Sequence, residues 1–194
     1  MGSQSGFPVD DRLTAEARPD LPLGLRHALD WLNRRLDKPI VLDADGLWAL
    51  AGHLDWVFSR DSATVLTPHA GELGRLLGRS SAWVNANRLD AVQAGADDTG
   101  TVVLLKGADT LVAGPGRSPV VVDLGNPGLA TAGSGDVLTG VVGAFLAKGM
   151  EAGVAATAAA AACGVASQGA AERHGEAGMI ARDVVESLSP ALSA

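Results

Sequence analysis

Three short apolar segments without polar alternation place the strongest constraint on how this 194-residue chain can fold. They lie at residues 39–43, 64–67 and 101–106, and helical periodicity occupies much of the sequence between them. Strands that are apolar on both faces are typical of parallel sheets covered by helices on each side. The sequence therefore predicts an α/β layered fold with a mainly parallel central sheet flanked by helices.

Turn residues and helical spacing predict the remaining elements. A β-hairpin is expected from residues 110–113 and 120–123, with a Gly-Pro-rich turn between them. Ser80 or Ser81 is the expected N-cap of one of the helices. Helices are expected at residues 23–36, 46–51, 54–58, 72–77, 82–94, 134–148, 151–173 and 181–188. Residues 1–22 are expected to be a flexible lead-in, and residues 23–194 a single domain.

Composition excludes several classes of function. A net charge of −7 argues against a nucleic-acid binder and against electrostatic binding to membranes. The single Cys163 excludes an internal disulfide and a Cys-rich metal site, and it fits a reducing compartment, so we expect a cytoplasmic protein. Residues 152–171 carry no charge, but they are mainly alanine and other small residues. This composition favours a closely packed buried helix over a membrane span.

A glycine-rich turn immediately before the helix expected at residues 134–148 carries the strongest chemical signal. Gly133, Ser134 and Gly135 would let backbone N–H groups converge at the positive end of the helix dipole, which is an arrangement that binds anions. Asp136 follows in the first helical turn. It would be an ordinary residue at a helix start, but beside an anion site it could also accept the proton of a hydroxyl group that is being phosphorylated.

Three further polar segments follow the expected strands, where ligands of open α/β sheets collect. Asp43-Ala-Asp45 could serve a metal or substrate, or could equally cap the next helix. In Thr67-Pro-His-Ala-Gly-Glu72, His69 is either a ligand contact or a structural hydrogen-bonding residue, and Glu72 either a metal ligand or a helix-start charge. Lys106 begins the segment Lys106–Thr110 and either contacts phosphate or extends into solvent.

Together these segments resemble one family. The residues Val41-Leu-Asp-Ala-Asp-Gly-Leu47, Thr67-Pro-His-Ala-Gly-Glu-Leu73, Val103-Leu-Leu-Lys-Gly-Ala-Asp-Thr110 and Gly125-Asn-Pro-Gly-Leu-Ala-Thr-Ala-Gly-Ser-Gly-Asp136 occur in the order found in the ADP/ATP-dependent NAD(P)H-hydrate dehydratases. That family belongs to the ribokinase-like superfamily, and the resemblance covers about residues 39 to 190.

The resemblance implies an enzyme of metabolite repair, a lyase. Its substrates would be hydrated NADH or NADPH and ADP or ATP, with Mg²⁺, and the hydroxyl of the hydrate would be phosphorylated before phosphate is eliminated. Asp136 would be catalytic and would contact the hydrate together with His69, and Glu72 would organise Mg²⁺ through water. The implied nucleotide-binding residues are Lys106, Gly107, Ala108, Asp109, Thr110, Gly133, Ser134 and Gly135.

The chain departs from the family pattern at its beginning. The glycine-rich strand–helix segment that opens the family domain is not found, so we expect an N-terminally incomplete ribokinase-like domain and a homo-oligomer. Two alternatives stay open. One is a small-molecule kinase of the same superfamily, and the other is a non-catalytic remnant that binds nucleotide.

Overall fold

The computed structural model describes residue 27, residues 35–58 and residues 60–192. The strands in this part are β1 (Ile40–Leu42), β2 (Thr64–Leu66), β3 (Val102–Leu105), β4 (Thr110–Ala113) and β5 (Val120–Val122). Its helices are α2 (Asp45–Leu50), α3 (Asp55–Phe58), α4 (Ala70–Leu76), α5 (Ser81–Ala86), α6 (Arg88–Thr99), the 3-10 helix η1 (Pro127–Leu129), α7 (Ser134–Ala147), α8 (Ala152–His174) and α9 (Ala181–Ala191). The expected lead-in at residues 1–22 and most of the expected helix at residues 23–36 lie outside the described residues.

The strands of the described part form one sheet in the order β1-β2-β3-β4-β5. β1, β2 and β3 run parallel, with Val41 opposite Val65 and Leu66 opposite Val103. β4 and β5 extend the sheet as antiparallel neighbours. The sheet is thus parallel where helices connect its strands and antiparallel where short turns connect them. The hairpin expected from residues 110–113 and 120–123 is present as β4 and β5, whereas the antiparallel pairing of β3 with β4 was not predicted. Because the three parallel strands point the same way, their carboxyl ends meet at one edge.

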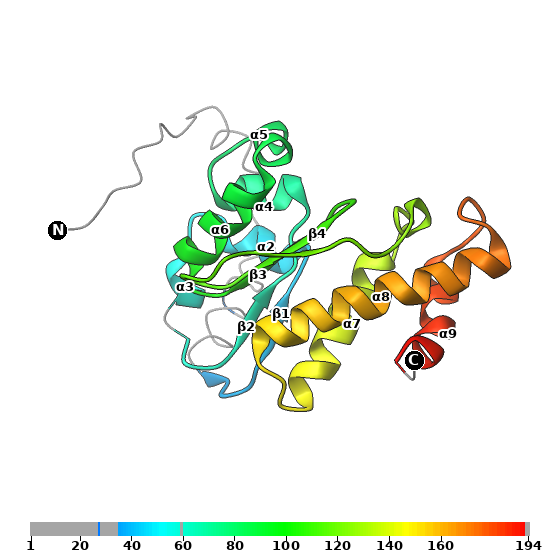
Figure 1. Ribbon diagram of the computed structural model, residues 1–194. Coiled ribbons are helices and arrows are strands. Elements are labelled where there is room, and N and C mark those ends of the chain that lie inside the picture. Colours follow the sequence, from blue (N-terminus) through cyan, green and yellow to red (C-terminus); the bar gives the residue numbers. More distant parts are fainter. Residues whose placement is uncertain (1–26, 28–34, 59, 193–194) are drawn as a thin grey trace.

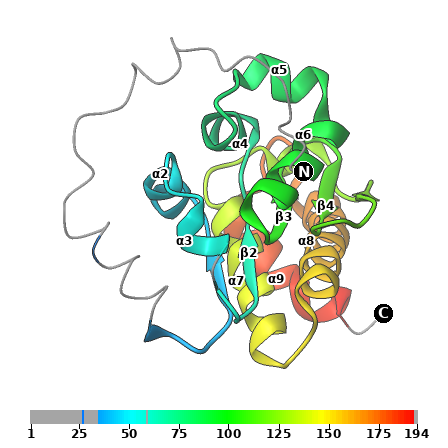
Figure 2. The same cartoon turned by 90° about the vertical axis from the view of Figure 1, so that its left-hand side faces the viewer.

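Helices cover both faces of this sheet (Figure 1). Leu66, Val103 and Leu105 pack in the core formed with α2 to α6, whereas Val65 and Leu104 pack in the core formed with α7 and α8. This division follows from the alternation of side chains along a strand. Figure 2 shows α4 to α6 and α7 to α9 on opposite sides of the strands. The predicted α/β layered fold is therefore confirmed.

The alanine-rich segment forms α8, which packs inside the protein. Among the described residues it is the one helix that is long and apolar enough to cross a membrane, and 56% of its most apolar window is buried. It contacts β2 to β5 as well as α7 and α9, as expected for a core helix. Burial raises the pKa of the Cys163 thiol on this helix to about 11, so the thiol stays protonated and unreactive at neutral pH.

The prediction of a single helix at residues 82–94 is wrong. The structure has two helices there, α5 and α6, which meet at Asn87 in a non-helical conformation (φ −132°, ψ 46°). The Asn87 side chain donates a hydrogen bond to the carbonyl oxygen of Trp83 at 2.9 Å, a local bond of the kind with which asparagine competes against helix continuation. Of the two candidate caps for α5, Ser80 is the one used: its Oγ accepts the N–H of Trp83 at 3.1 Å.

Candidate active site

The ends of β1 and β3 are joined by an ion pair. Lys106 follows β3, and its Nζ donates to Oδ1 of Asp43, which follows β1, at 2.8 Å. The two residues lie 63 positions apart in the chain, and the parallel strands bring them together. Their side chains are only 21% and 12% exposed, so this pair is better shielded from water than an ordinary surface salt bridge.

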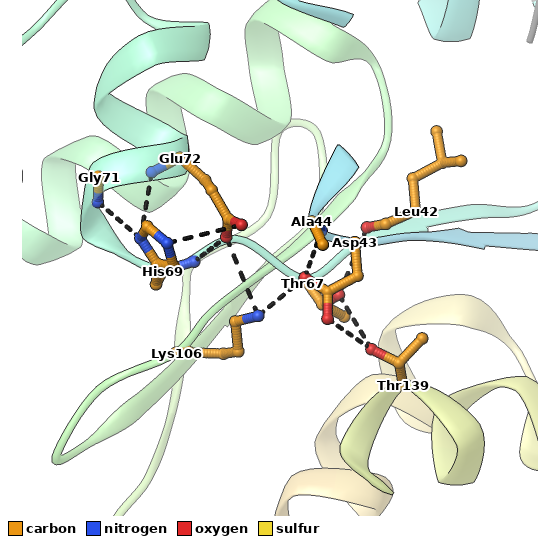
Figure 3. A network of polar contacts seen from close by, with 9 residues as sticks. All are labelled: Leu42, Asp43, Ala44, Thr67, His69, Gly71, Glu72, Lys106 and Thr139. Carbon is orange, nitrogen blue, oxygen red and sulfur yellow. Dashed lines mark hydrogen bonds and ion pairs between the residues drawn. The ribbon is translucent and has the colours of Figure 1, made fainter. Parts of the chain in front are cut away.

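Helix α7 is tied to the same carboxylate. Thr139 Oγ1 donates to Oδ2 of Asp43 at 2.9 Å, so both carboxylate oxygens are engaged (Figure 3). The Thr139 hydroxyl also lies 3.4 Å from that of Thr67, a buried residue that follows β2. Thr67 in turn donates from Oγ1 to the carbonyl oxygen of Leu42 at 3.3 Å. The ends of β1, β2 and β3 and the second turn of α7 therefore form one polar cluster.

His69 begins helix α4 as its N-cap. Its Nδ1 accepts the backbone N–H groups of Gly71 and Glu72 at 2.9 and 3.2 Å, and Glu72 Oε2 accepts the N–H of His69 at 2.8 Å. This is a capping box with histidine in the place usually taken by serine or threonine. Gly71 makes it possible, because a Cβ there would lie 2.9 Å from Cε1 of the imidazole. The side chain of His69 remains 60% exposed, which leaves the ring available to a ligand.

Glu72 connects His69 to Lys106. Its Oε1 lies 3.5 Å from Nε2 of His69 and its Oε2 lies 3.9 Å from Nζ of Lys106. The ammonium group is therefore placed between two carboxylates and lies closer to Asp43. This trio of two carboxylates and one ammonium carries one net negative charge, with Glu72 only 14% exposed.

The glycine-rich turn reaches this cluster at Gly135. Gly133 caps α7 with a positive φ of 88°, a left-handed conformation that glycine adopts without strain. Ser134 fastens the turn by donating from Oγ to the carbonyl oxygens of Leu129 and Thr131 at 2.7 and 3.0 Å. A Cβ on Gly135 would lie 3.5 Å from Nζ of Lys106 and 3.8 Å from Oδ2 of Asp43. The ammonium group of Lys106 and the glycine-rich turn are therefore neighbours and line the same site.

Asp136 stands in the first turn of α7, directly after Gly135, and is exposed. Within residues 35–58 and 60–192, its carboxylate makes no hydrogen bond or ion pair. Both lone-pair-bearing oxygens are thus free to accept a proton or a hydrogen bond from a ligand.

The segment Lys106–Thr110 forms the connection between β3 and β4. These two strands are antiparallel, with Leu105 opposite Leu111, so residues 106–109 form a short hairpin loop. The guanidinium of Arg88, from the start of α6, donates to the carbonyl oxygens of Asp109 at 2.7 Å and of Leu105 and Lys106 at 3.4 Å each. A Cβ on Gly107 would lie 2.5 Å from Nη2 of Arg88, so the guanidinium packs directly against the loop backbone.

We expect Arg88→Lys to lower the free energy of unfolding by about 1–3 kcal/mol, because an ammonium cannot replace a planar guanidinium that holds three carbonyl groups. Urea unfolding measures the decrease in the free energy of unfolding. The rate of amide hydrogen exchange should increase most at residues 107–110. Arg117→Lys is the control, because the Arg117 side chain is 74% exposed and its one polar contact with described residues is a long ion pair, of 3.8 Å, with Glu151. Equal stability of the two variants would contradict the role given to Arg88.

The structure brings His69, Glu72, Lys106 and Gly135 together through shared contacts, and it adds residues that the sequence left open or missed. Asp43 was an open candidate, whereas Arg88 and Thr139 went unnoticed. Asp43 has a sequence signal, since it directly follows a buried strand. Arg88 and Thr139 have none, because their partners lie 17 to 21 and 96 positions away.

The comparisons with known proteins agree with one another. A family model described as NAD(P)H-hydrate dehydratase matches residues 23–190. The bifunctional NAD(P)H-hydrate repair enzyme Nnr of Moorella thermoacetica is 42% identical over 154 residues, which cover 79% of this chain and 29% of that protein. The ADP-dependent (S)-NAD(P)H-hydrate dehydratase of Neisseria meningitidis is 46% identical over 124 residues, which cover 61% of this chain and 41% of that protein.

Solved structures share the fold. The ADP/ATP-dependent NAD(P)H-hydrate dehydratase of Bacillus subtilis, co-crystallised with ATP and Mg²⁺, superposes with a TM-score of 0.73 at 28% identity, over 81% of this chain and 55% of that one. A ribokinase-like superfamily protein of Enterococcus faecalis shows the same fold at a TM-score of 0.68 and 20% identity, over 90% of this chain and 60% of that one.

The chain spans less than two thirds of the length of each of these proteins. The family model nevertheless matches most of the chain. The matched residues include the four sequence motifs, which contain the polar cluster and the glycine-rich turn. The fold is ribokinase-like, and the chain belongs to the NAD(P)H-hydrate dehydratase family.

Proposed function

We propose that this protein catalyses the nucleotide-dependent dehydration of hydrated NADH and NADPH, which restores the reduced nicotinamide ring. Family membership supports the reaction, and its ADP-dependent and ADP/ATP-dependent relatives support ADP or ATP as the co-substrate. Hydroxide is a poor leaving group and phosphate a good one, so spending a phosphoryl group makes the elimination feasible.

The observation that carries the proposal is the closeness of Lys106 to Gly135. An ammonium group beside the N-terminus of α7 forms a site for the phosphates of the nucleotide, with the N–H groups at Gly133, Ser134 and Gly135 as donors. The N–H of Ser134 donates over a long 3.4 Å to the carbonyl oxygen of Thr131 and would exchange that bond for one to phosphate. The hairpin loop of Lys106, Gly107, Ala108 and Asp109, with Thr110 at its end, would contact the rest of the nucleotide.

Asp136 is the proposed catalytic base. As the hydroxyl oxygen of the hydrate attacks the terminal phosphorus, its proton passes to the Asp136 carboxylate and the shortened nucleotide leaves. In the second step the carbon–oxygen bond breaks, inorganic phosphate departs with the bonding electrons, and loss of a proton from the neighbouring carbon restores the double bond. The exposed imidazole of His69 would bind the hydrate beside Asp136.

Mg²⁺ is the proposed cofactor, and it would neutralise phosphate charge when bound. No cluster of three or more His, Cys, Asp or Glu side chains suited to a metal occurs among the described residues. A Mg²⁺ ion that is held by phosphates and water needs only one or two carboxylates, and Glu72 supplies a hard oxygen donor of this kind. Glu72 Oε2 accepts the N–H of His69, which holds the carboxylate in place, and we propose that it organises Mg²⁺ through water.

We also propose a cytoplasmic homo-oligomer. A buried, protonated Cys163 is compatible with a reducing compartment. Val120 and Val121 on the edge strand β5 are 46% and 54% exposed, and a second copy would cover them.

The test incubates the full chain with NADH hydrate, Mg²⁺ and either ADP or ATP while the absorbance of the reduced nicotinamide ring is followed. The expected result is recovery of absorbance that depends on nucleotide and releases phosphate. A stable phosphorylated product, detected by mass spectrometry, would instead indicate a kinase. Nucleotide binding by folded protein without any turnover would indicate a non-catalytic remnant.

A further inference from the structure

Asp43 has contacts that go beyond those of a salt-bridge partner. Its carboxylate accepts the Lys106 ammonium and the Ala44 N–H on Oδ1, at 2.8 and 2.9 Å, and the Thr139 hydroxyl on Oδ2 at 2.9 Å. We infer that Asp43 is a positioning residue that fixes the ammonium of Lys106 against the first turn of α7. This inference rests on the proposed function, since Lys106 is its nucleotide-binding residue.

A lysine side chain is free to adopt many conformations. An ammonium on four rotatable bonds samples many positions, and ordering it costs up to about 2 kcal/mol in rotamer entropy. The ion pair with Asp43 orders the Lys106 side chain before the nucleotide binds. It holds Nζ 3.5 Å from the position that a Cβ on Gly135 would occupy. A ligand phosphate in the turn would then find the cation already in place.

Lys106 has a second carboxylate, that of Glu72, as an alternative partner. Glu72 Oε2 lies 3.9 Å from Nζ, against 2.8 Å for Asp43. If the charge on Asp43 is removed, Glu72 is the remaining carboxylate that contacts Lys106 among the described residues, and it belongs to α4 rather than to the end of β1. The ammonium would move toward α4 and away from the turn.

Asp43 is itself held in position by α7. Thr139 lies on α7, one turn after Asp136, so its hydroxyl locks the carboxylate to the helix whose N-terminus forms the anion site. The distance between lysine and turn is thus set by a chain of two short bonds, from Lys106 to Asp43 and from Asp43 to Thr139 (Figure 3).

Asp43 affects an anionic ligand in two opposite ways, and the direction in which Asp43→Asn changes the Kd for ADP shows which one dominates. A carboxylate near a phosphate repels it, so a role in charge masking predicts tighter nucleotide binding by Asp43→Asn. Positioning predicts weaker binding. We expect the Kd for ADP with Mg²⁺, measured by calorimetry on the full chain, to rise by about three- to tenfold, because the ammonium is no longer held in place.

A double-mutant cycle separates positioning from a general structural effect. Lys106→Met should weaken ADP binding, and adding Asp43→Asn to it should weaken binding no further, because Asp43 acts through Lys106. Thr139→Val should change the Kd in the same direction as Asp43→Asn, whereas Thr139→Ser, which keeps the hydroxyl, should bind as the wild type does. Asp45→Asn removes the same charge from an exposed residue nearby and should not weaken binding.

Unchanged or tighter ADP binding by folded Asp43→Asn overturns the inference, as does weakening that adds fully to that of Lys106→Met. These results leave the proposed function standing, because that function is judged by recovery of NADH in the wild type. Failure of the wild type to bind nucleotide at all overturns both.

Discussion

Asp136→Asn is expected to lower the turnover of hydrated NADH by about 10²- to 10⁴-fold, the range that a positioned general base contributes. Asparagine keeps the size and shape of the side chain, but its amide cannot take the proton of the attacking hydroxyl. Since Asp136 is exposed and its carboxylate makes no hydrogen bond or ion pair within the described residues, the fold should be unaffected. The Kd for ADP should stay within about threefold of the wild type, because the turn amides and Lys106 remain.

Asp90→Asn provides a matched control for this loss. Asp90 also lies exposed in the first turn of a helix, α6, so its replacement removes the same favourable charge from a helix N-terminus. Turnover by Asp90→Asn should equal that of the wild type. Rapid turnover by Asp136→Asn, with normal dependence on nucleotide, would remove Asp136 from the catalytic role and leave it as a helix-start residue.

Gly164→Ala should lower the free energy of unfolding by about 1–3 kcal/mol, the usual cost of forcing an extra carbon into a packed core. A Cβ at this position on α8 would lie 2.6 Å from Cβ of Leu124 and 2.8 Å from its carbonyl carbon and oxygen. Backbone cannot move aside as a side-chain tip can. The overlap should therefore outweigh the gain of up to about 1 kcal/mol that alanine brings to a helix interior.

Gly169→Ala on the same helix is the matched comparison. The nearest atom to a Cβ there is Cβ of Ser187 at 4.0 Å, an ordinary contact. This variant should be more stable than the wild type by up to about 1 kcal/mol. Urea unfolding of both variants measures the pair of opposite shifts, and destabilisation by both in equal measure would show that close approach to Leu124 is not the cause.

Gly164→Ala should also weaken nucleotide binding, because α8 holds the segment that leads into the glycine-rich turn. Nδ2 of Asn126 donates to the carbonyl oxygen of Ser167 at 2.9 Å, and Oδ1 of Asn126 accepts the N–H of Gly128 at 2.9 Å. Displacement of Leu124 would distort both hydrogen bonds of Asn126, and with them the position of the glycine-rich turn.

Local patterns predicted most of the fold. Strands β1, β2 and β3 are continuous apolar runs, and they lie within about a residue of their expected limits. The break between α5 and α6 was missed because no proline or glycine marks it. It depends on the backbone conformation of Asn87, a residue that helices also tolerate.

The candidate site was predictable only where a residue follows a strand or opens a helix. His69, Lys106 and Asp136 all stand in such places, so sheet topology alone brings the first two to one edge. Pairing is different. That Lys106 meets Asp43 more closely than Glu72 depends on strand order and on Thr139, and that Arg88 braces the hairpin loop depends on where α6 crosses the sheet. Neither the pairing of Lys106 with Asp43 nor the contact of Arg88 with the loop can be predicted from the spacing of residues in the sequence.

The buried surface of α8 consists largely of alanine, with Gly164 and Ser167 among the few other residues. Alanine and glycine have no rotamers to lose, whereas each buried leucine gives up about 0.5–1 kcal/mol of side-chain entropy on folding. The helix that holds the segment before the glycine-rich turn, through Ser167 and Asn126, is therefore ordered at almost no cost in side-chain freedom. Warming populates alternative rotamers of long side chains, and the buried surface of α8 contributes none of these. The spacing between α8 and the segment before the turn should therefore vary less with temperature than contacts in which both sides carry long side chains.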